Sequence, residues 1–270
     1  MRQGVSADTC KTMLAFALLL VIEVAAQNPG QPFTACDSEQ LQRCQGVFND
    51  YLQIDGNIKV LRHSLPRSLN VLTYDKLRAA IEYKIGSEQE SGMMKTCDGF
   101  KYYKTCYNSR NDYANCANNP LGLIIDQNGN AEKYRNQVKV FNYRTATGIS
   151  PAAAFGYTKI FNQFDFSCGA GYGEFMNNAD CASTVFLNGV SDMRKCDDNL
   201  AQSISKDSNP VNTCAYIEVA KECYMTIFSK SCPGRNEVAW WGCNYERVGT
   251  QTNYPQCDQI FCTYTDPGRR

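Results

Sequence analysis

The stretch 97–116 reads CDGFKYYKTCYNSRNDYANC, and a related stretch at 214–232 reads CAYIEVAKECYMTIFSKSC. Each contains the pattern C-x8-C-Y, in which eight residues separate two cysteines and a tyrosine follows the second. A third cysteine comes after eight or nine further residues, and a lysine stands two positions before the central cysteine. This internal repeat is the strongest pattern in the chain. It concerns architecture, so the sequence indicates how the protein is held together and where it works, not what it does.

The cysteine spacing predicts an arrangement if each stretch is a helix. Nine residues at about 100° each amount to half a turn beyond whole turns. Cys97 and Cys106 then face opposite ways, as do Cys214 and Cys223. Such a helix cannot bridge to itself, but each of its sides can be linked to a different neighbour. The pattern therefore predicts two helices that sit in the middle of a bundle.

Metal binding is the alternative role for these cysteines. Structural zinc sites use closely spaced cysteine pairs, usually together with histidine. The closest pair here, Cys257 and Cys262, has four residues between its members, and the other cysteines are farther apart. Spacing and compartment favour disulfides, although the sequence leaves their connectivity open. The predicted disulfide cysteines are Cys36, Cys44, Cys97, Cys106, Cys116, Cys168, Cys181, Cys196, Cys214, Cys223, Cys232, Cys243, Cys257 and Cys262.

Composition narrows the class of protein. The 270 residues include 27 basic and 27 acidic side chains, so nothing in the net charge points to nucleic acid or to an anionic membrane surface. Fifteen cysteines are too many for an ordinary cytosolic protein and too few per residue for a small toxin scaffold. We therefore expect a hydrophobic core to which bridges are added.

The first 26 residues predict a secretory signal peptide, and hence a secreted, extracellular protein. A polar, weakly basic leader at 1–11 precedes an apolar run at 12–26 that is short for a membrane span. Small residues at 24–26 place cleavage after Ala26, with an uncleaved anchor as the alternative. Loss of Cys10 leaves fourteen cysteines, an even number that fits complete pairing. No second apolar segment follows, so we predict no membrane span.

Apolar residues recur at helical spacing along the mature chain and strand alternation is scarce, which predicts an all-α fold, a disulfide-stapled helical bundle. Asp37 is placed to cap the first helix, and Gly86 to close the second. Cys181 and Cys196, fifteen residues apart, are expected within about 60° on one face of one helix. Helices are expected at 37–56, 73–86, 93–107, 134–141, 151–161, 180–196, 210–229 and from 236 onward.

We expect residues 27–270 to form a single disulfide-rich helical domain with pseudo-repeat units at about 36–144 and 160–262. A connector at about 145–151 has five of the fourteen cysteines before it and nine after it. Both counts are odd. If every thiol is paired within one chain, an odd number of bridges must cross the connector.

Patterns that carry catalytic chemistry are few. His63 is the one histidine, and its sequence RHSLPR is typical of an exposed turn without a nucleophile motif. A hydrolase that uses two carboxylates stays an alternative, although acidic residues are spread thinly. We predict that the protein is not an enzyme and has no catalytic, cofactor-binding or metal-binding residue.

Three further patterns have a structural and a functional interpretation. The segment 126–130 resembles the start of a calcium loop, but Ala131 and Gln137 replace the expected glycine and glutamate, which favours a polar turn. The glycine-rich segment 168–173 follows no strand, which disfavours a nucleotide loop. Aromatic residues are expected in or beside the core, with sugar or mineral binding by the tyrosines as the alternative; they are Tyr102, Tyr103, Tyr107, Tyr113, Trp240 and Trp241.

The order of the cysteines, together with FDFSC at 164–168, EFMNNADC at 174–181 and CAYIEVAKECY at 214–224, resembles a group of secreted invertebrate domains. The group includes nematode chondroitin-proteoglycan-4-like domains and related molluscan secreted matrix proteins. The resemblance covers most of residues 36–262 and rests on cysteines and a few aromatic residues. It implies an extracellular helical domain without known catalysis, which is sometimes a matrix component.

Two functions of different classes are compatible with these patterns. The first is a non-enzymatic structural or interaction protein in an extracellular organic matrix such as shell or eggshell, whose partner is a matrix polymer or protein. It predicts retention in an insoluble or polymer-bound fraction. The second is a soluble carrier or effector that binds a small apolar ligand or a receptor, which predicts an apolar cavity and free diffusion.

Overall fold

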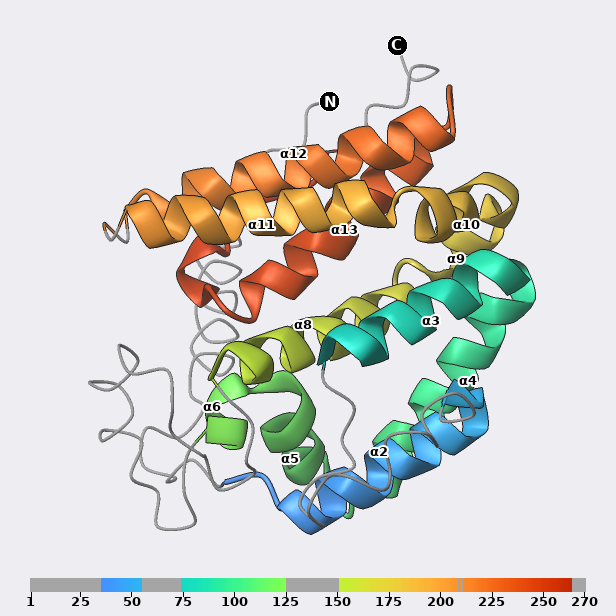
Figure 1. The fold of residues 1–270 in the computed structure, drawn as a ribbon, viewed down its shortest axis with the longest axis vertical. Coiled ribbons are helices and arrows are strands. Elements are labelled where there is room, and N and C mark those ends of the chain that lie inside the picture. The colour runs from blue at the N-terminus through green and yellow to red at the C-terminus, as the bar shows by residue number, and fades with distance from the viewer. Residues whose placement is uncertain (1–34, 55–73, 125–150, 208, 210, 264–270) are drawn as a thin grey trace, which may run out of the picture. The chain divides into compact units, whose positions relative to one another are not determined.

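The structure is a computed structural model that describes residues 35–54, 74–124, 151–207, 209 and 211–263 (Figure 1). Every regular element in these ranges is helical, which confirms the all-α prediction. The described residues belong to one compact unit. The predicted signal peptide lies outside them, as does the predicted helix at 134–141.

The helices differ in length from a single turn to five turns. In chain order they are α2 (Ser38–Leu52), α3 (Tyr74–Glu88), α4 (Glu90–Cys106), α5 (Arg110–Tyr113), the π-helical turn η3 (Ala114–Asn118), α6 (Pro120–Ile124), α8 (Pro151–Ser167), α9 (Tyr172–Met176), α10 (Ala179–Asn188), α11 (Val190–Lys206), α12 (Thr213–Ser231), α13 (Asn236–Gln251) and the 3₁₀ turn η4 (Pro255–Cys257).

The start of α2 agrees with the sequence, whereas the end of α3 does not. The Asp37 carboxylate accepts hydrogen bonds from the backbone N–H groups of Glu39 and Gln40, as expected of a helix cap. Gly86 was expected to close the second helix, but α3 continues to Glu88. A Cβ atom on Gly86 would lie 2.7 Å from Cγ of Leu187, so this glycine permits close packing of α3 on α10.

The single helix expected over 180–196 is wrong. The chain forms two helices there, and the break falls at Gly189, which ends α10 and precedes α11. The residue that precedes α10 is Asn178. Cys181 and Cys196 therefore lie on different helices, and the one-face relationship predicted for them does not exist.

Helix α8 packs against helices that come before it in the chain and against helices that come after it. It packs against α3, α4, α6 and η3, and also against α9 and α13 (Figure 1). Helix α4 packs on α2 and α3, while α12 packs on α11 and α13. One continuous apolar core runs through these contacts, from Phe48 of α2 to Tyr245 of α13. The two sequence units thus share a core. Its largest fully buried side chains are aromatic.

All fourteen cysteines between positions 36 and 262 are paired. The disulfides are Cys36–Cys116, Cys44–Cys106, Cys97–Cys168, Cys181–Cys232, Cys196–Cys223, Cys214–Cys257 and Cys243–Cys262.

The two C-x8-C helices use their cysteines on opposite sides, as predicted. In α4, Cys106 bonds to α2, and Cys97 bonds to Cys168, which follows α8. In α12, Cys223 bonds to α11, and Cys214 bonds to η4. Each helix is therefore fixed covalently to two different neighbours, and half a turn between the cysteines is what makes this possible.

Candidate functional site

Ionisable side chains from α3, α8, α11 and α13 form a connected set of ion pairs that is largely buried. We call it the ionic cluster. It contains three basic and three acidic residues, which are Arg78, Lys159, Arg194, Glu82, Asp197 and Glu246. Because the signs balance, the cluster carries no net charge when every member is ionised.

Asp197 is the acceptor for several donors in the cluster. Its Oδ2 lies 2.6 Å from Nη1 of Arg78, and its Oδ1 lies 2.9 Å from Nζ of Lys159. The Tyr224 hydroxyl donates a hydrogen bond to Oδ1 over 3.0 Å, and it accepts one from Arg78 Nη2 over 2.7 Å. This tyrosine follows the central cysteine of α12. In α12 the repeated Cys-Tyr pair therefore supplies a hydrogen-bonding partner to the ionic cluster.

The two glutamates of the cluster are held by different cations. Glu246 is 0 % exposed, and Nζ of Lys159 lies 2.9 Å from its Oε1 and 2.8 Å from its Oε2. Glu82 accepts a 2.9 Å hydrogen bond from Nε of Arg78 and also contacts both terminal nitrogens of Arg194. Every charged group in the cluster thus has an oppositely charged partner.

Burial and pairing act in opposite directions on the cluster's acids. Burial raises the pKa of Glu246 to about 7, although Lys159 pulls it down. Burial also acts to raise the pKa of Asp197, but Lys159 and Arg78 outweigh it and hold that pKa well below its usual range. Asp197 is the stronger acid because Arg78 and Lys159 lie 2.6 Å and 2.9 Å from its carboxylate, whereas among the described residues Glu246 pairs with Lys159 alone.

The cluster's position limits what it can do. Arg78, Glu82 and Glu246 are buried, and Arg194 is the member with the most exposed side chain. Paired and enclosed charges fix the relative positions of the helices that carry them, and removal of one partner leaves an uncompensated buried charge. The arrangement supports a structural role.

A second buried polar network joins three tyrosines to α2. The Tyr107 hydroxyl donates a 2.7 Å hydrogen bond to the Tyr103 hydroxyl. The Tyr103 hydroxyl in turn lies 3.1 Å from the hydroxyl of Tyr157. Tyr157 donates to Oε1 of Gln45, whose Nε2 donates to Asn49 over 2.6 Å. Burial raises the pKa of the Tyr103 and Tyr157 hydroxyls well above their usual value, so both stay protonated donors.

The tyrosines that the sequence offered for surface binding therefore separate into two kinds. Tyr103 and Tyr107 are buried, and Tyr113 is mostly enclosed and donates to Asp165 over 3.0 Å. Tyr102 is 53 % exposed, and its ring centroid lies 5.1 Å from that of Tyr51. The four tyrosines do not form one surface.

A groove of about 360 Å³ lies beside the Cys97–Cys168 disulfide. Met94, Asp98 and Lys101 of α4 line it together with Tyr172 of α9. Lys104, also in the lining, is paired with Asp165 at 2.9 Å and lies 4.6 Å above the ring centroid of Phe100. The lining mixes charged and apolar groups.

The two tryptophans, which were expected in or beside the core, lie near the glycine-rich segment and α8. The carbonyl of Gly171 accepts a 2.9 Å hydrogen bond from Nε1 of Trp241, which is buried. Trp240 is partly buried, and its ring lies against Phe166. The segment 168–173 leads from α8 into the start of α9 and follows no strand, as expected from the sequence.

Other predicted positions lie outside the described residues. They include His63 and the calcium-like segment 126–137. Within the described ranges, no three side chains of the kinds that bind metals come together as a metal-ion site. None of the helices described has both the length and the apolarity that a bilayer span requires.

The chain matches no known family model, no curated protein and no solved structure. The resemblance to secreted invertebrate domains therefore stays a prediction from cysteine order.

The ionic cluster is the feature that the sequence did not predict. One signal was present, because Lys159 stands in an apolar run between Tyr157 and Ile160–Phe161. Glu246 similarly follows the buried Tyr245. A charged residue inside an apolar helical face indicates a buried partner, but nothing local identifies which partner.

Proposed function

We propose that the protein is a secreted, non-enzymatic structural or interaction protein of an extracellular organic matrix such as shell or eggshell. The observation that carries the proposal is the pairing of all fourteen cysteines of the described chain in seven disulfides. Disulfides in this number persist in oxidising compartments and are rare in the cytosol. The apolar run at 12–26 supports the same compartment.

The cross-links suit a component that must keep its shape outside the cell. Helices α4 and α12 are each bonded to two neighbours, once near one end and once near the middle, which limits local unfolding of either helix. The balanced ionic cluster supports the non-enzymatic part of the proposal, because its charges are committed to one another. Its members are therefore structural residues in this account.

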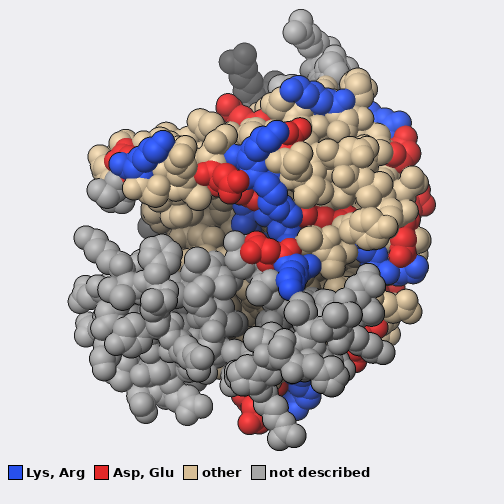
Figure 2. Space-filling model, viewed as in Figure 1, with Lys and Arg blue, Asp and Glu red and all other residues tan. Residues whose placement is uncertain are grey.

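A matrix polymer or protein is the proposed partner. Figure 2 shows basic and acidic side chains interspersed on the face drawn, without a broad area of one sign. Together with equal numbers of basic and acidic residues, this favours a partner other than nucleic acid or an anionic membrane.

The groove beside the Cys97–Cys168 disulfide favours a second candidate, a soluble carrier or effector. Its volume of about 360 Å³ lies at the small end of ligand pockets. Asp98, Lys101 and Lys104 in the lining make it a poorer match for a purely apolar ligand than an enclosed apolar cavity would be.

Sequential extraction of the native protein separates the two candidates. Source tissue is extracted first with saline and then with denaturant and reductant, and the protein is quantified in each fraction by antibody. The matrix function predicts that most of the protein appears only in the second fraction, with Gln27 at its N-terminus. A protein found mainly in the saline extract or in body fluid overturns the matrix function and supports the carrier.

A further inference from the structure

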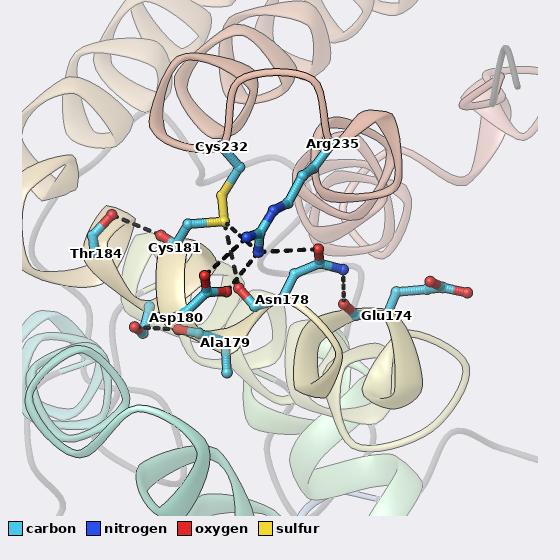
Figure 3. The surroundings of a disulfide bond; sticks show 9 residues. Glu174, Asn178, Ala179, Asp180, Cys181, Thr184, Cys232 and Arg235 are labelled. Atoms are coloured by element: carbon cyan, nitrogen blue, oxygen red, sulfur yellow. Dashed lines mark hydrogen bonds and ion pairs between the residues drawn. A yellow bond between two sulfur atoms is a disulfide. The ribbon is translucent and has the colours of Figure 1, made fainter. Parts of the chain in front are cut away.

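The Cys181–Cys232 disulfide has a cation against one of its sulfur atoms (Figure 3). Nη1 of Arg235 lies 3.4 Å from Sγ of Cys181. The guanidinium also holds the Asp180 carboxylate, at 2.6 Å and 2.9 Å through its two terminal nitrogens. In the part of the chain that the structure describes, no other disulfide sulfur has a lysine or arginine nitrogen within hydrogen-bonding distance.

This environment stabilises a thiolate on Cys181. A nearby arginine and the start of a helix both lower the free energy of a cysteine thiolate. Cys181 has both features, because it is the third residue of α10 and contacts Arg235. The carboxylate of Asp180 acts in the opposite sense, since it competes for the guanidinium and adds a negative charge next to the sulfur.

The two cysteines differ in accessibility. Cys181 is partly exposed, whereas Cys232 is 2 % exposed at the end of α12. The side chain of Arg235 is 39 % exposed, so the guanidinium borders solvent. A small thiol can therefore approach Cys181 but not Cys232.

We propose that Cys181 is a thiol-exchange site, at which a small thiol of the glutathione class opens the Cys181–Cys232 disulfide. In the first step the incoming thiolate attacks Cys181 Sγ, a mixed disulfide forms, and Cys232 leaves with the bonding electrons and takes up a proton. In the second step another thiolate attacks the small-molecule sulfur of that mixed disulfide. Cys181 then leaves as the thiolate that Arg235 binds.

Over the two steps, two small thiols are oxidised to one small-molecule disulfide, and the protein disulfide is reduced to a thiol and a thiolate. Arg235 acts on the second step, because a stabilised thiolate is the better leaving group and the more stable product. The product lacks the covalent link between α10 and the end of α12, while six disulfides stay closed.

The chain contains a matched control. In the Cys214–Cys257 disulfide, Cys214 is also partly exposed and also lies in the first turn of a helix, and Cys257 is also buried. Its sulfur atoms have no arginine or lysine partner among the described residues. A difference between the two disulfides therefore reports the charged surroundings of Cys181, which are Arg235 and Asp180.

The test is an equilibrium titration of the folded, full-length secreted chain in buffers of reduced and oxidised glutathione. Free thiols are trapped by alkylation, and mass spectrometry measures the reduced fraction of each cysteine pair. Two thiols are consumed per disulfide, so the midpoint is expressed as the squared concentration of reduced glutathione divided by the concentration of oxidised glutathione. We expect this midpoint to be at least tenfold lower for Cys181–Cys232 than for Cys214–Cys257. The factor of about ten follows from a charge-assisted hydrogen bond to the product thiolate.

Two variants separate an electrostatic role of Arg235 from a structural one. Arg235→Gln should make Cys181–Cys232 about tenfold harder to reduce, and Asp180→Asn should make it easier to reduce. If Arg235 only stabilised the folded structure around the disulfide, Arg235→Gln would loosen that structure and make reduction easier. The proposal is overturned if Cys214–Cys257 opens first, or if Arg235→Gln leaves the midpoint unchanged or eases reduction. If Arg235→Gln does not fold, the comparison of the two disulfides in the parent protein decides.

Discussion

Cys97 of α4 and Cys168, which directly follows α8, lie 5.2 Å apart between their Cα atoms and form a disulfide. Of the bridges in the described chain, this one alone joins residues before position 125 to residues after position 150. The odd cysteine counts on each side of the connector predicted an odd number of crossings, and the structure has one. This bridge is therefore the covalent link between the two sequence units.

Removal of the Cys97–Cys168 bridge should lower the free energy of unfolding more than removal of a short-range bridge. The sequence separation is 71 residues here and 19 residues for Cys243–Cys262. The chain-entropy model gives losses of ~4 and ~3 kcal/mol for the two double Cys→Ser variants. Denaturant unfolding followed by circular dichroism measures both. Equal or reversed losses would contradict the entropic account of the crossing bridge.

Lys159→Met should destabilise the protein strongly, because it leaves Glu246 buried without its cation. Loss of one partner from a buried ion pair costs about 3–5 kcal/mol. Lys195→Met is the control, since Lys195 has a 71 % exposed side chain and pairs with Asp192 at the surface. Thermal unfolding of both variants tests this, and a control variant as unstable as Lys159→Met would refute the role of the cluster.

Glu246 should make stability depend on pH. Its folded-state pKa of about 7 lies above the ordinary value of 4.5, so the folded protein binds the proton more tightly than the unfolded chain. The free energy of unfolding should consequently fall as pH rises from about 4.5 to 7, by on the order of 1–3 kcal/mol from this group.

Glu246→Gln should remove that contribution. Denaturant unfolding of parent and variant at several pH values gives the difference between their stabilities. We expect this difference to change with pH between about 4.5 and 7 and to be constant at higher pH. A difference that is constant across the whole range would mean that Glu246 does not titrate there.

Gly242→Ala should destabilise the contact between α12 and α13. A Cβ atom at this position would lie 2.3 Å from Cδ2 of the buried Phe228, and overpacking of this kind typically costs about 1–3 kcal/mol. Gly46→Ala in α2 is the matched control, because a Cβ there meets no atom within 4 Å. Alanine at position 46 should stabilise α2 slightly through helix propensity. Thermal melts with the same sign for both variants would be inconsistent with the packing.

The all-α class and the two-sided use of Cys97 and Cys106 could be predicted, because both follow from helical periodicity, which is local. Gly86 and the break at Gly189 were misjudged because packing decides them. A glycine can end a helix or admit a neighbour such as Leu187, and its sequence context is the same in both cases.

The ionic cluster could not be assembled from the sequence for a related reason. Arg78 and Asp197 are 119 residues apart, and periodicity places each on a helical face without stating which faces meet. The contact between Arg235 and Cys181 spans 54 residues and has the same origin. Pairing across the fold depends on tertiary contacts, which no local pattern encodes.

Cleavage of the chain between the two units tests the central claim, that one disulfide joins them covalently. A protease site is introduced at position 144, and the cleaved protein is analysed by electrophoresis in denaturant with and without reductant. The fragments of the parent should migrate together without reductant and separate after reduction. The fragments of the Cys97→Ser/Cys168→Ser variant should separate without reductant, since every other described bridge lies within one fragment. Parent fragments that separate before reduction, or variant fragments that stay joined, would contradict the account.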